Sequence, residues 1–201
     1  MDLNDYTFLG WCSPEKRDYL MNWITIHKPK VITEIGVFGG ACLIPMAIAG
    51  QPHGAKTVGI DPWEVGPCLA GMVEQANRDW WAQHSSLRNA YHAAKDAVAK
   101  FELKKTELWV GTSDHYKDSF QDGEIGVLSI DGNHGPQAIL DAKNYFRKVA
   151  PGGLIACDDT DWVEGGVFNV RQAIDWLRDQ GCEFLSIVDT CTMLVKGPKA
   201  A

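Results

Sequence analysis

The stretch that decides the fold is residues 31–41, VITEIGVFGGA. Its first five residues are rich in β-branched apolar side chains, which is typical of a short buried strand. The glycines that follow allow the backbone to turn sharply from strand to helix and to approach a ligand closely. Because many α/β proteins carry such a turn for packing alone, the turn by itself is a weak indication of a binding site.

Glu34, near the end of this strand, narrows the choice of ligand. A carboxylate aimed at the turn repels a pyrophosphate but suits the ammonium group of an amino acid. The residue therefore favours a pocket for S-adenosylmethionine over a pocket for NAD.

Beyond residues 31–41, short apolar runs alternate with longer amphipathic stretches, a pattern typical of a parallel sheet with helices packed on both faces. Strands are expected at 31–35, 57–60, 107–110, 125–130 and 153–157. Helices are expected at 14–26, 136–149 and 168–180. Ser13 caps the first of them, and Pro151-Gly152-Gly153 ends the second.

The end of the chain departs from a plain dinucleotide-binding fold. The strand-like runs 183–188 and 192–196 are joined by Asp189-Thr190-Cys191, which predicts a hairpin whose last strand runs antiparallel to its neighbour. The predicted fold class is therefore α/β. We expect a doubly wound, Rossmann-like, mostly parallel seven-stranded sheet with an antiparallel C-terminal strand.

A chain of 201 residues fits a single domain, 1–201. Within it, residues 1–29 are expected to form an N-terminal helical extension. The segment 62–101 is long for a crossover connection, and its pattern predicts two helices that could roof a substrate pocket as a lid. In the alternative interpretation, its tryptophans only pack these helices onto the sheet.

The composition argues against several classes of function. The net charge of −7 and the lack of basic runs argue against a nucleic-acid partner. No apolar stretch approaches the ~18 residues of a membrane-spanning helix, and the N-terminus lacks a signal-peptide pattern. The six cysteines form no Cys-x-x-Cys pair, which predicts free thiols and a cytoplasmic protein. Whether the chain forms a homo-oligomer is left open.

Two polar residues at other strand ends suit an adenosine ligand. Asp61 ends the second strand roughly 20 residues past the glycine turn, where an acidic side chain can bind ribose hydroxyls. In the alternative, Asp61 only caps a helix. Ser113, after the third strand, could bond the adenine edge, while Ser113 or Asp114 caps the next helix.

The clearest chemical constellation joins Asp131 and His134 with the acidic pair Asp158 and Asp159. If the fourth and fifth strands are adjacent, the three aspartates converge at the carboxyl edge of the sheet, where open α/β sheets bind ligands. Such close carboxylates repel one another unless a cation neutralises them, and Mg²⁺ suits oxygen ligands of this kind. His134 suits proton removal at neutral pH. In the alternative, these residues are dispersed as caps and surface charges.

Together these segments resemble the class I S-adenosylmethionine-dependent methyltransferases. More narrowly, they resemble the magnesium-dependent O-methyltransferases of the macrocin and cephalosporin-biosynthesis type, grouped as methyltransferase domain 24. The segments that carry the resemblance are Glu34-Ile35-Gly36 with Gly40, Gly59-Ile60-Asp61-Pro62-Trp63, Ile130-Asp131-Gly132-Asn133-His134, and Pro151-Gly152-Gly153 leading into Asp158-Asp159.

The resemblance implies transfer of a methyl group from S-adenosylmethionine to a small-molecule hydroxyl on a sugar, phenol or polyketide-type natural product. It implies that His134 acts as the base, that Asp131 also serves catalysis, and that Mg²⁺ is held by Asp131, Asp158 and Asp159. The cofactor-binding set that we assign comprises Glu34, Gly36, Gly40, Asp61, Trp63, Ser113 and Asp131.

Two other functions fit the sequence less well. An NAD-dependent oxidoreductase is disfavoured by Glu34, by the lack of a full G-x-G-x-x-G motif and by the terminal hairpin. A non-catalytic module that binds an adenosyl cofactor gains weight from Cys42 and Pro45, which depart from the family pattern.

Overall fold

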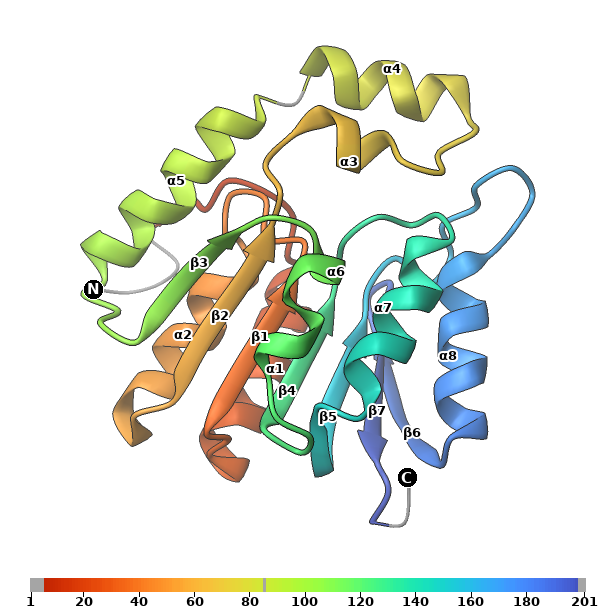
Figure 1. The fold of residues 1–201 in the computed structure, drawn as a ribbon. Helices are drawn as coiled ribbons and strands as arrows, with labels where there is room; N and C mark the ends of the chain where they lie inside the picture. The colour runs from red at the N-terminus through yellow and green to blue at the C-terminus, as the bar shows by residue number, and fades with distance from the viewer. Residues whose placement is uncertain (1–5, 85, 199–201) are drawn as a thin grey trace.

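The computed structural model describes residues 6–84 and 86–198, which form a seven-stranded sheet in the order β3-β2-β1-β4-β5-β7-β6 (Figure 1). The strands are β1 Val31–Ile35, β2 Lys56–Asp61, β3 Thr106–Val110, β4 Ile125–Ile130, β5 Val149–Cys157, β6 Cys182–Val188 and β7 Cys191–Lys196. The first five strands pair in parallel, and β7 runs antiparallel to both β5 and β6. The predicted fold class and the terminal hairpin are confirmed.

Helices cover both faces of the sheet. The α-helices are α1 Pro14–His27, α2 Leu43–Gly50, α3 Val65–Leu69, α4 Gln75–His84, α5 Leu87–Lys100, α6 Ser113–Tyr116, α7 Gln137–Phe146 and α8 Asn169–Asp179, with short 3-10 turns at Gln51–His53 and Lys117–Ser119. Helices α1, α2 and α5 lie on one face, and α6, α7 and α8 lie on the other (Figure 1).

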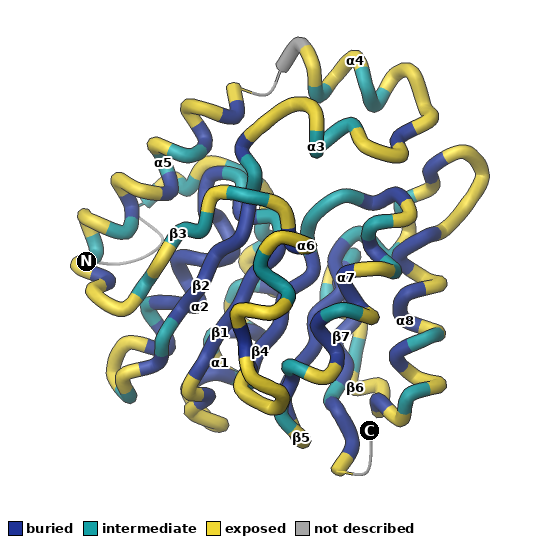
Figure 2. Tube along the Cα trace, in the orientation of Figure 1, coloured by how far each residue is buried: buried dark blue, intermediate teal, exposed yellow. Residues whose placement is uncertain are grey.

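The alternation of side chains along each strand builds two cores. Ile32, Val127 and Leu154 pack against α1 and α2, while their neighbours Val31, Leu128 and Ile155 pack against α7 and α8. The inner strands β1, β2, β4, β5 and β7 are therefore mostly buried, as Figure 2 shows, whereas the edge strands β3 and β6 are partly exposed. Burial on both sides explains why the central strands read as nearly continuous apolar runs. Among the described residues, no helix has the length and apolar character needed to cross a bilayer.

The N-terminal segment is a structural layer of the domain. Ser13 caps α1 as predicted, its hydroxyl oxygen accepting the backbone N–H of Lys16 at 3.2 Å. Leu20 and Ile24 of α1 are buried in the same core as β1 and β4. Residues 14–27 thus cover the sheet itself, which places the first turn of α1 beside the carboxyl ends of the strands.

Two predictions about the number and the ends of helices are wrong. The described part of segment 62–101 contains three helices, α3, α4 and α5, where two were expected. Helix α7 ends at Phe146, because Val149 pairs with Ile125 and already belongs to β5. The pairing resumes at Val127 and Leu154, so the Pro-Gly-Gly run at 151–153 forms an irregularity inside the strand pair.

Gly36, in the turn after β1, occupies a position where only glycine fits. Gly36 has a φ of +86°, and a Cβ there would lie 2.0 Å from the carbonyl oxygen of Asp131. The turn and the end of β4 therefore lie in direct backbone contact. Helix α2 begins late, at Leu43, which leaves Pro45 in its first turn, where the missing N–H costs nothing.

Candidate active site

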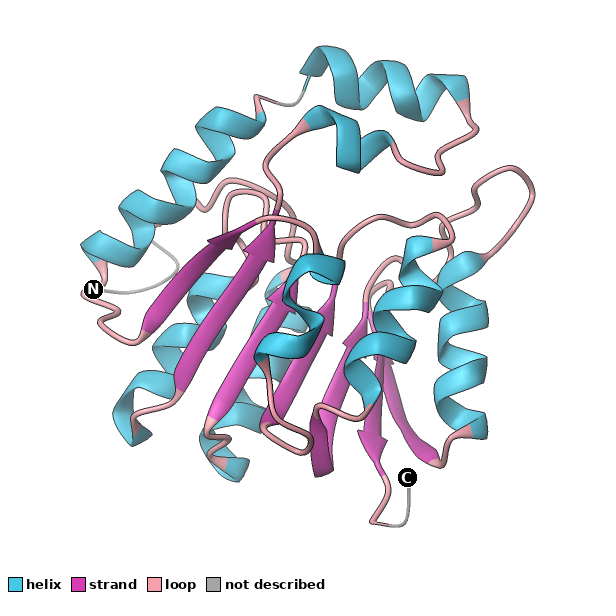
Figure 3. Ribbon diagram, in the orientation of Figure 1, coloured by secondary structure: helices cyan, strands magenta, loops and turns pink. Residues whose placement is uncertain are grey.

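A cavity of about 1120 Å³ lies at the carboxyl ends of β1, β2, β4 and β5. Residues of the loops that follow the strands line it, as do residues of α3 and α4. These two helices lie above the carboxyl ends of the strands (Figure 3). The structure brings together, as lining residues, most of the predicted site: Glu34, Gly36, Asp61, Ser113, Asp131, His134, Asp158 and Asp159. Gly40 and Trp63 are not among the described residues that line it; Gly40 lies within the glycine turn, and Trp63 is hydrogen-bonded to Phe38 of that turn.

Glu34 reaches the cavity from the middle of the sheet. It is fully buried on β1, between Gly59 of β2 and Ser129 of β4. Neither carboxylate oxygen has a nitrogen or oxygen hydrogen-bond partner among the described residues, although the Cys42 thiol lies beside it. Burial, and after it the neighbouring Cys42, raises the pKa of Glu34 well above its ordinary value. A buried carboxyl group without a partner is a candidate for binding a cationic group of a ligand.

Asp61 stabilises the glycine turn through hydrogen bonds to backbone amides. Its Oδ2 accepts the backbone N–H groups of Val37 and Phe38, both at 2.9 Å, and its Oδ1 accepts that of Trp63 at 2.7 Å. Burial raises the pKa of Asp61, and these three amides oppose that rise. The indole of Trp63 donates to the Phe38 carbonyl oxygen at 2.7 Å. Both residues therefore fix the shape of the turn, and a contact of Asp61 with ribose stays a prediction.

Ser113 belongs to a polar cluster that sequence reasoning missed. Its hydroxyl donates to Asp141 Oδ1 at 2.5 Å, and the amide of Gln137 donates to the same oxygen at 2.8 Å. Asp141 lies on α7 and lines the cavity. Burial raises the pKa of Asp141 to about 6, although both hydrogen bonds oppose the shift. The N-cap of α6 is Thr112, so the prediction that Ser113 or Asp114 caps this helix is wrong.

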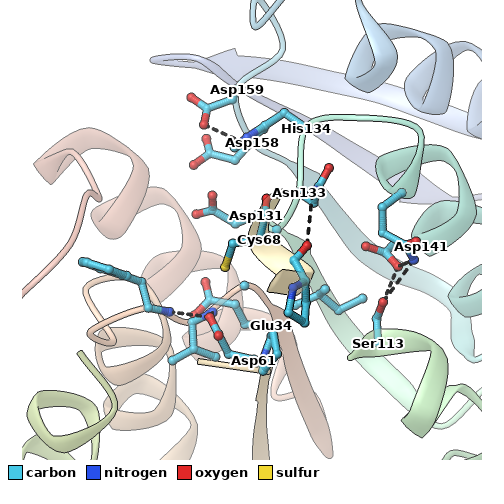
Figure 4. Close-up of a pocket in the computed structure, with 18 of the residues that line it drawn as sticks. Glu34, Asp61, Cys68, Ser113, Asp131, Asn133, His134, Asp141, Asp158 and Asp159 are labelled. Carbon is cyan, nitrogen blue, oxygen red and sulfur yellow. Dashed lines mark hydrogen bonds and ion pairs between the residues drawn. The ribbon is translucent and has the colours of Figure 1, made fainter. Parts of the chain in front are cut away.

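The carboxylates predicted to converge do lie together, at the ends of β4 and β5 (Figure 4). His134 Nε2 lies 2.8 Å from Asp159 Oδ2, and this contact lowers the pKa of Asp159. Asp131, His134 and Asp159 each offer a ligand atom within 4.8 Å of the others. Asp158 is buried and points to a different partner, with its Oδ1 left unbonded among the described residues.

That partner is Lys16, which sequence reasoning also missed. Its ammonium lies 3.3 Å from Asp131 Oδ2 and forms a shorter ion pair with Asp158 Oδ2. Burial lowers the pKa of Lys16, but Asp131, Cys42 and Asp158 outweigh it and raise the pKa above its ordinary value. A lysine in the first turn of a helix opposes the helix dipole. That unfavourable placement was the available sequence signal for a functional role.

The residues just before α4 are hydrogen-bonded to the loop after β5. Glu164, 4% exposed, accepts the backbone N–H groups of Val73 and Glu74, both at 2.6 Å, just before α4 begins. In the same loop, the Trp162 indole stacks on the His134 ring, with 4.7 Å between centroids. Trp162 thus forms an aromatic wall beside the acidic cluster, and Pro67, Trp80 and Trp81 of segment 62–101 also line the cavity.

The family model for a methyltransferase domain matches residues 33–160, which include the glycine turn, helices α3, α4 and α5, and the acidic cluster. The chain belongs to this methyltransferase family. The predicted class, a class I S-adenosylmethionine-dependent methyltransferase, is therefore confirmed. No curated protein sequence matches the chain.

Solved structures share the fold of this methyltransferase at low sequence identity. The O-methyltransferase TomG from Streptomyces achromogenes, involved in tomaymycin synthesis and solved with SAM, is 19% identical, with 93% of this chain and 82% of that chain covered and a TM-score of 0.68. An O-methyltransferase from Bacillus cereus, solved with SAH, is 15% identical, with coverages of 94% and 84% and a TM-score of 0.67. PaMTH1 from Podospora anserina, bound to SAH, is 15% identical, with coverages of 92% and 80% and a TM-score of 0.65.

Asp141 makes the stability of this methyltransferase depend on pH. Its folded-state pKa of about 6 lies above its unfolded value, so its contribution to stability is fully present below about pH 4 and is lost as the pH rises through about 6. Asp141→Asn keeps a neutral acceptor for Ser113 and Gln137. We expect the variant to match the wild type near pH 4. At pH 8 it should be more stable by about 2–3 kcal/mol, at roughly 1.4 kcal/mol per pKa unit.

Urea unfolding at several pH values measures this difference directly. Asp175→Asn, which removes an exposed carboxylate from α8, is the matched control and should show no such trend. A constant difference between Asp141→Asn and the wild type from pH 4 to pH 8 would contradict the prediction.

Proposed function

We propose that this methyltransferase transfers a methyl group from S-adenosylmethionine to the hydroxyl oxygen of a small molecule, such as a sugar, phenol or polyketide-type natural product. One observation carries the proposal. A single cavity holds Glu34, a buried carboxyl group with no nitrogen or oxygen partner among the described residues, together with a histidine–aspartate pair, His134 and Asp159. The first group suits an amino-acid ammonium, and the second suits removal of a hydroxyl proton.

The residues of the glycine turn suit the methyl donor. Glu34 would receive the ammonium group, with Asp131 nearby, and Gly36 allows the close backbone approach at this point. Asp61 would receive the ribose with the lone pairs that its backbone contacts leave free, and Ser113 would face the adenine. Gly40 and Trp63 would contribute to cofactor binding indirectly, by keeping the glycine turn in its shape. S-adenosylmethionine supplies an activated methyl group, and relatives solved with SAM or SAH support this choice of cofactor.

His134 is proposed as the general base. Asp159, 2.8 Å from its Nε2, would stabilise the imidazolium that forms, and the stacked Trp162 holds the ring in place. The acceptor hydroxyl gives its proton to His134 while its oxygen forms a bond to the methyl carbon. The carbon–sulfur bond of the donor breaks in the same step, which leaves S-adenosylhomocysteine and a methyl ether. Because the donor is already activated, most of the rate gain comes from positioning the two reactants.

We also propose that the acidic cluster holds Mg²⁺ through Asp131, Asp158 and Asp159. The donor set fits in kind, since Mg²⁺ prefers oxygen ligands and Asp158 Oδ1 is buried without a partner among the described residues. When bound there, the cation would lower the pKa of the acceptor hydroxyl and orient it. Among the described residues, the ligand atoms that all lie within 4.8 Å of one another belong instead to Asp131, His134 and Asp159, a set that would remove His134 from its role as base.

Thermal melting with a panel of ligands tests the proposal. The protein is melted alone, with S-adenosylhomocysteine, with NAD, and with each of these plus Mg²⁺ or a chelator. A ligand at 100 times its dissociation constant stabilises the folded state by about 2.7 kcal/mol, which raises Tm by several degrees. We expect S-adenosylhomocysteine to raise Tm and NAD to leave it unchanged. No response to S-adenosylhomocysteine would contradict the proposed cofactor.

A labelled-methyl assay on hydroxylated acceptors completes the test. Transfer of label from S-adenosylmethionine to a sugar, phenol or polyketide hydroxyl is the expected result. Cofactor binding without transfer to any such acceptor would instead favour a non-catalytic binding module.

A further inference from the structure

Helix α1 delivers a positive charge into the acidic cluster. Lys16, in the first turn of α1, is only 4% exposed, and its ammonium is paired with carboxylates from two different strand ends, Asp131 after β4 and Asp158 after β5. These pairs link residues that are 115 and 142 positions apart in the chain. The arrangement is therefore a tertiary feature of a buried site.

The ammonium lies where a cation shared by these carboxylates would bind. Both contacts use Oδ2 atoms, the one of Asp131 and the one of Asp158. A divalent ion bridging the same two carboxylates, even through the free Oδ1 of Asp158, would lie within strong repulsion of the ammonium. The third carboxylate, Asp159, is partnered by His134. Each carboxylate of the cluster thus has a partner within the protein before any ion binds, and for Asp131 and Asp158 that partner is a positive charge.

We propose that Lys16 is the resident cation of this cluster and that a divalent ion binds between Asp131 and Asp158 only by displacing its ammonium. The inference rests on the proposed function only in taking these carboxylates as the cation site. The affinity of the site for a metal ion is then set by the competition between that ion and the Lys16 ammonium for the two carboxylates. The residues just before α1 also line the cavity: Gly10, Trp11, Cys12 and Ser13. Displacement of the Lys16 ammonium would therefore also move this part of the cavity wall.

Binding of Mn²⁺ to the purified full-length protein tests the proposal without reference to methyl transfer. Free Mn²⁺ is counted by electron paramagnetic resonance for the wild type, Lys16→Gln and Lys30→Gln. The last variant removes the same charge from an exposed position and is the matched control. We expect Lys16→Gln to bind Mn²⁺ at least tenfold more tightly than the wild type, and Lys30→Gln to match the wild type. Equal or weaker binding by Lys16→Gln would overturn the proposal.

A second measurement uses the wild-type protein, so that the test does not depend on the folding of a variant. Nitrogen-15 NMR of labelled lysine side chains follows the Lys16 ammonium during a titration with Mg²⁺ up to saturation. We expect its resonance to move away from the position of the ion-paired ammonium, while that of Lys30 stays in place. A Lys16 resonance unchanged at saturating Mg²⁺ would overturn the proposal. Failure of S-adenosylhomocysteine to bind would count against the proposed function alone.

Discussion

Replacement of His134 by glutamine is expected to lower kcat for methyl transfer by about 10²–10⁴, the usual contribution of a general base. His134 lies in the cavity with Asp159 at 2.8 Å and Trp162 stacked on its ring, so it is held where an acceptor hydroxyl would approach. Glutamine can still form hydrogen bonds but cannot take up the proton. The affinity for S-adenosylhomocysteine should stay within about twofold, because the proposed cofactor contacts do not involve His134.

The measurement is the initial rate of label transfer to an acceptor that the wild type methylates, with S-adenosylhomocysteine affinity determined by calorimetry. His115→Gln is the control, because His115 is exposed and lies on α6. A His134→Gln variant that keeps more than a third of the wild-type rate would exclude His134 as the base. A variant that instead loses cofactor affinity would give His134 a binding role.

Replacement of Glu34 by glutamine is the second change with a large expected effect. A hydrogen bond to a charged group contributes about 1.5–3 kcal/mol, so we expect a 10–100-fold rise in the dissociation constant of S-adenosylhomocysteine. The argument rests on burial: Glu34 is fully buried, and no nitrogen or oxygen of the described residues satisfies its carboxylate. An ammonium group at that point would gain a partner that the free protein does not supply.

Calorimetric titration of Glu34→Gln with S-adenosylhomocysteine checks this expectation. Glu183→Gln, which removes an exposed carboxylate from β6, is the control for the change in net charge. The Tm of ligand-free Glu34→Gln should not fall, because glutamine has a similar shape and carries no charge to bury. Unchanged affinity together with a normal Tm would show that Glu34 does not face the cofactor ammonium.

The sequence by itself determined the strands and the helices outside segment 62–101, apart from some of their ends. Strands β1 and β4 begin and end at the predicted residues, and the hairpin of β6 and β7 was predicted from two apolar runs separated by three residues. Such features depend on local patterns of apolar and turn-forming residues, which persist whatever the chain packs against. The strand ends in turn placed Glu34, Asp131 and His134 at one edge of the sheet, since parallel strands share that edge.

Only the tertiary structure decided which of these side chains meet. Lys16 reaches Asp131 and Asp158 because α1 packs across β1 and β4, and Asp141 reaches Ser113 because α7 lies beside α6. In both cases the partners are far apart in sequence, and periodicity fixes the face of a helix but not the residue that faces it across the core. The Pro-Gly-Gly irregularity in β5 depends likewise on its pairing with β4. Local sequence patterns therefore determined where the strands run, and packing between distant elements determined which charged side chains meet in the site.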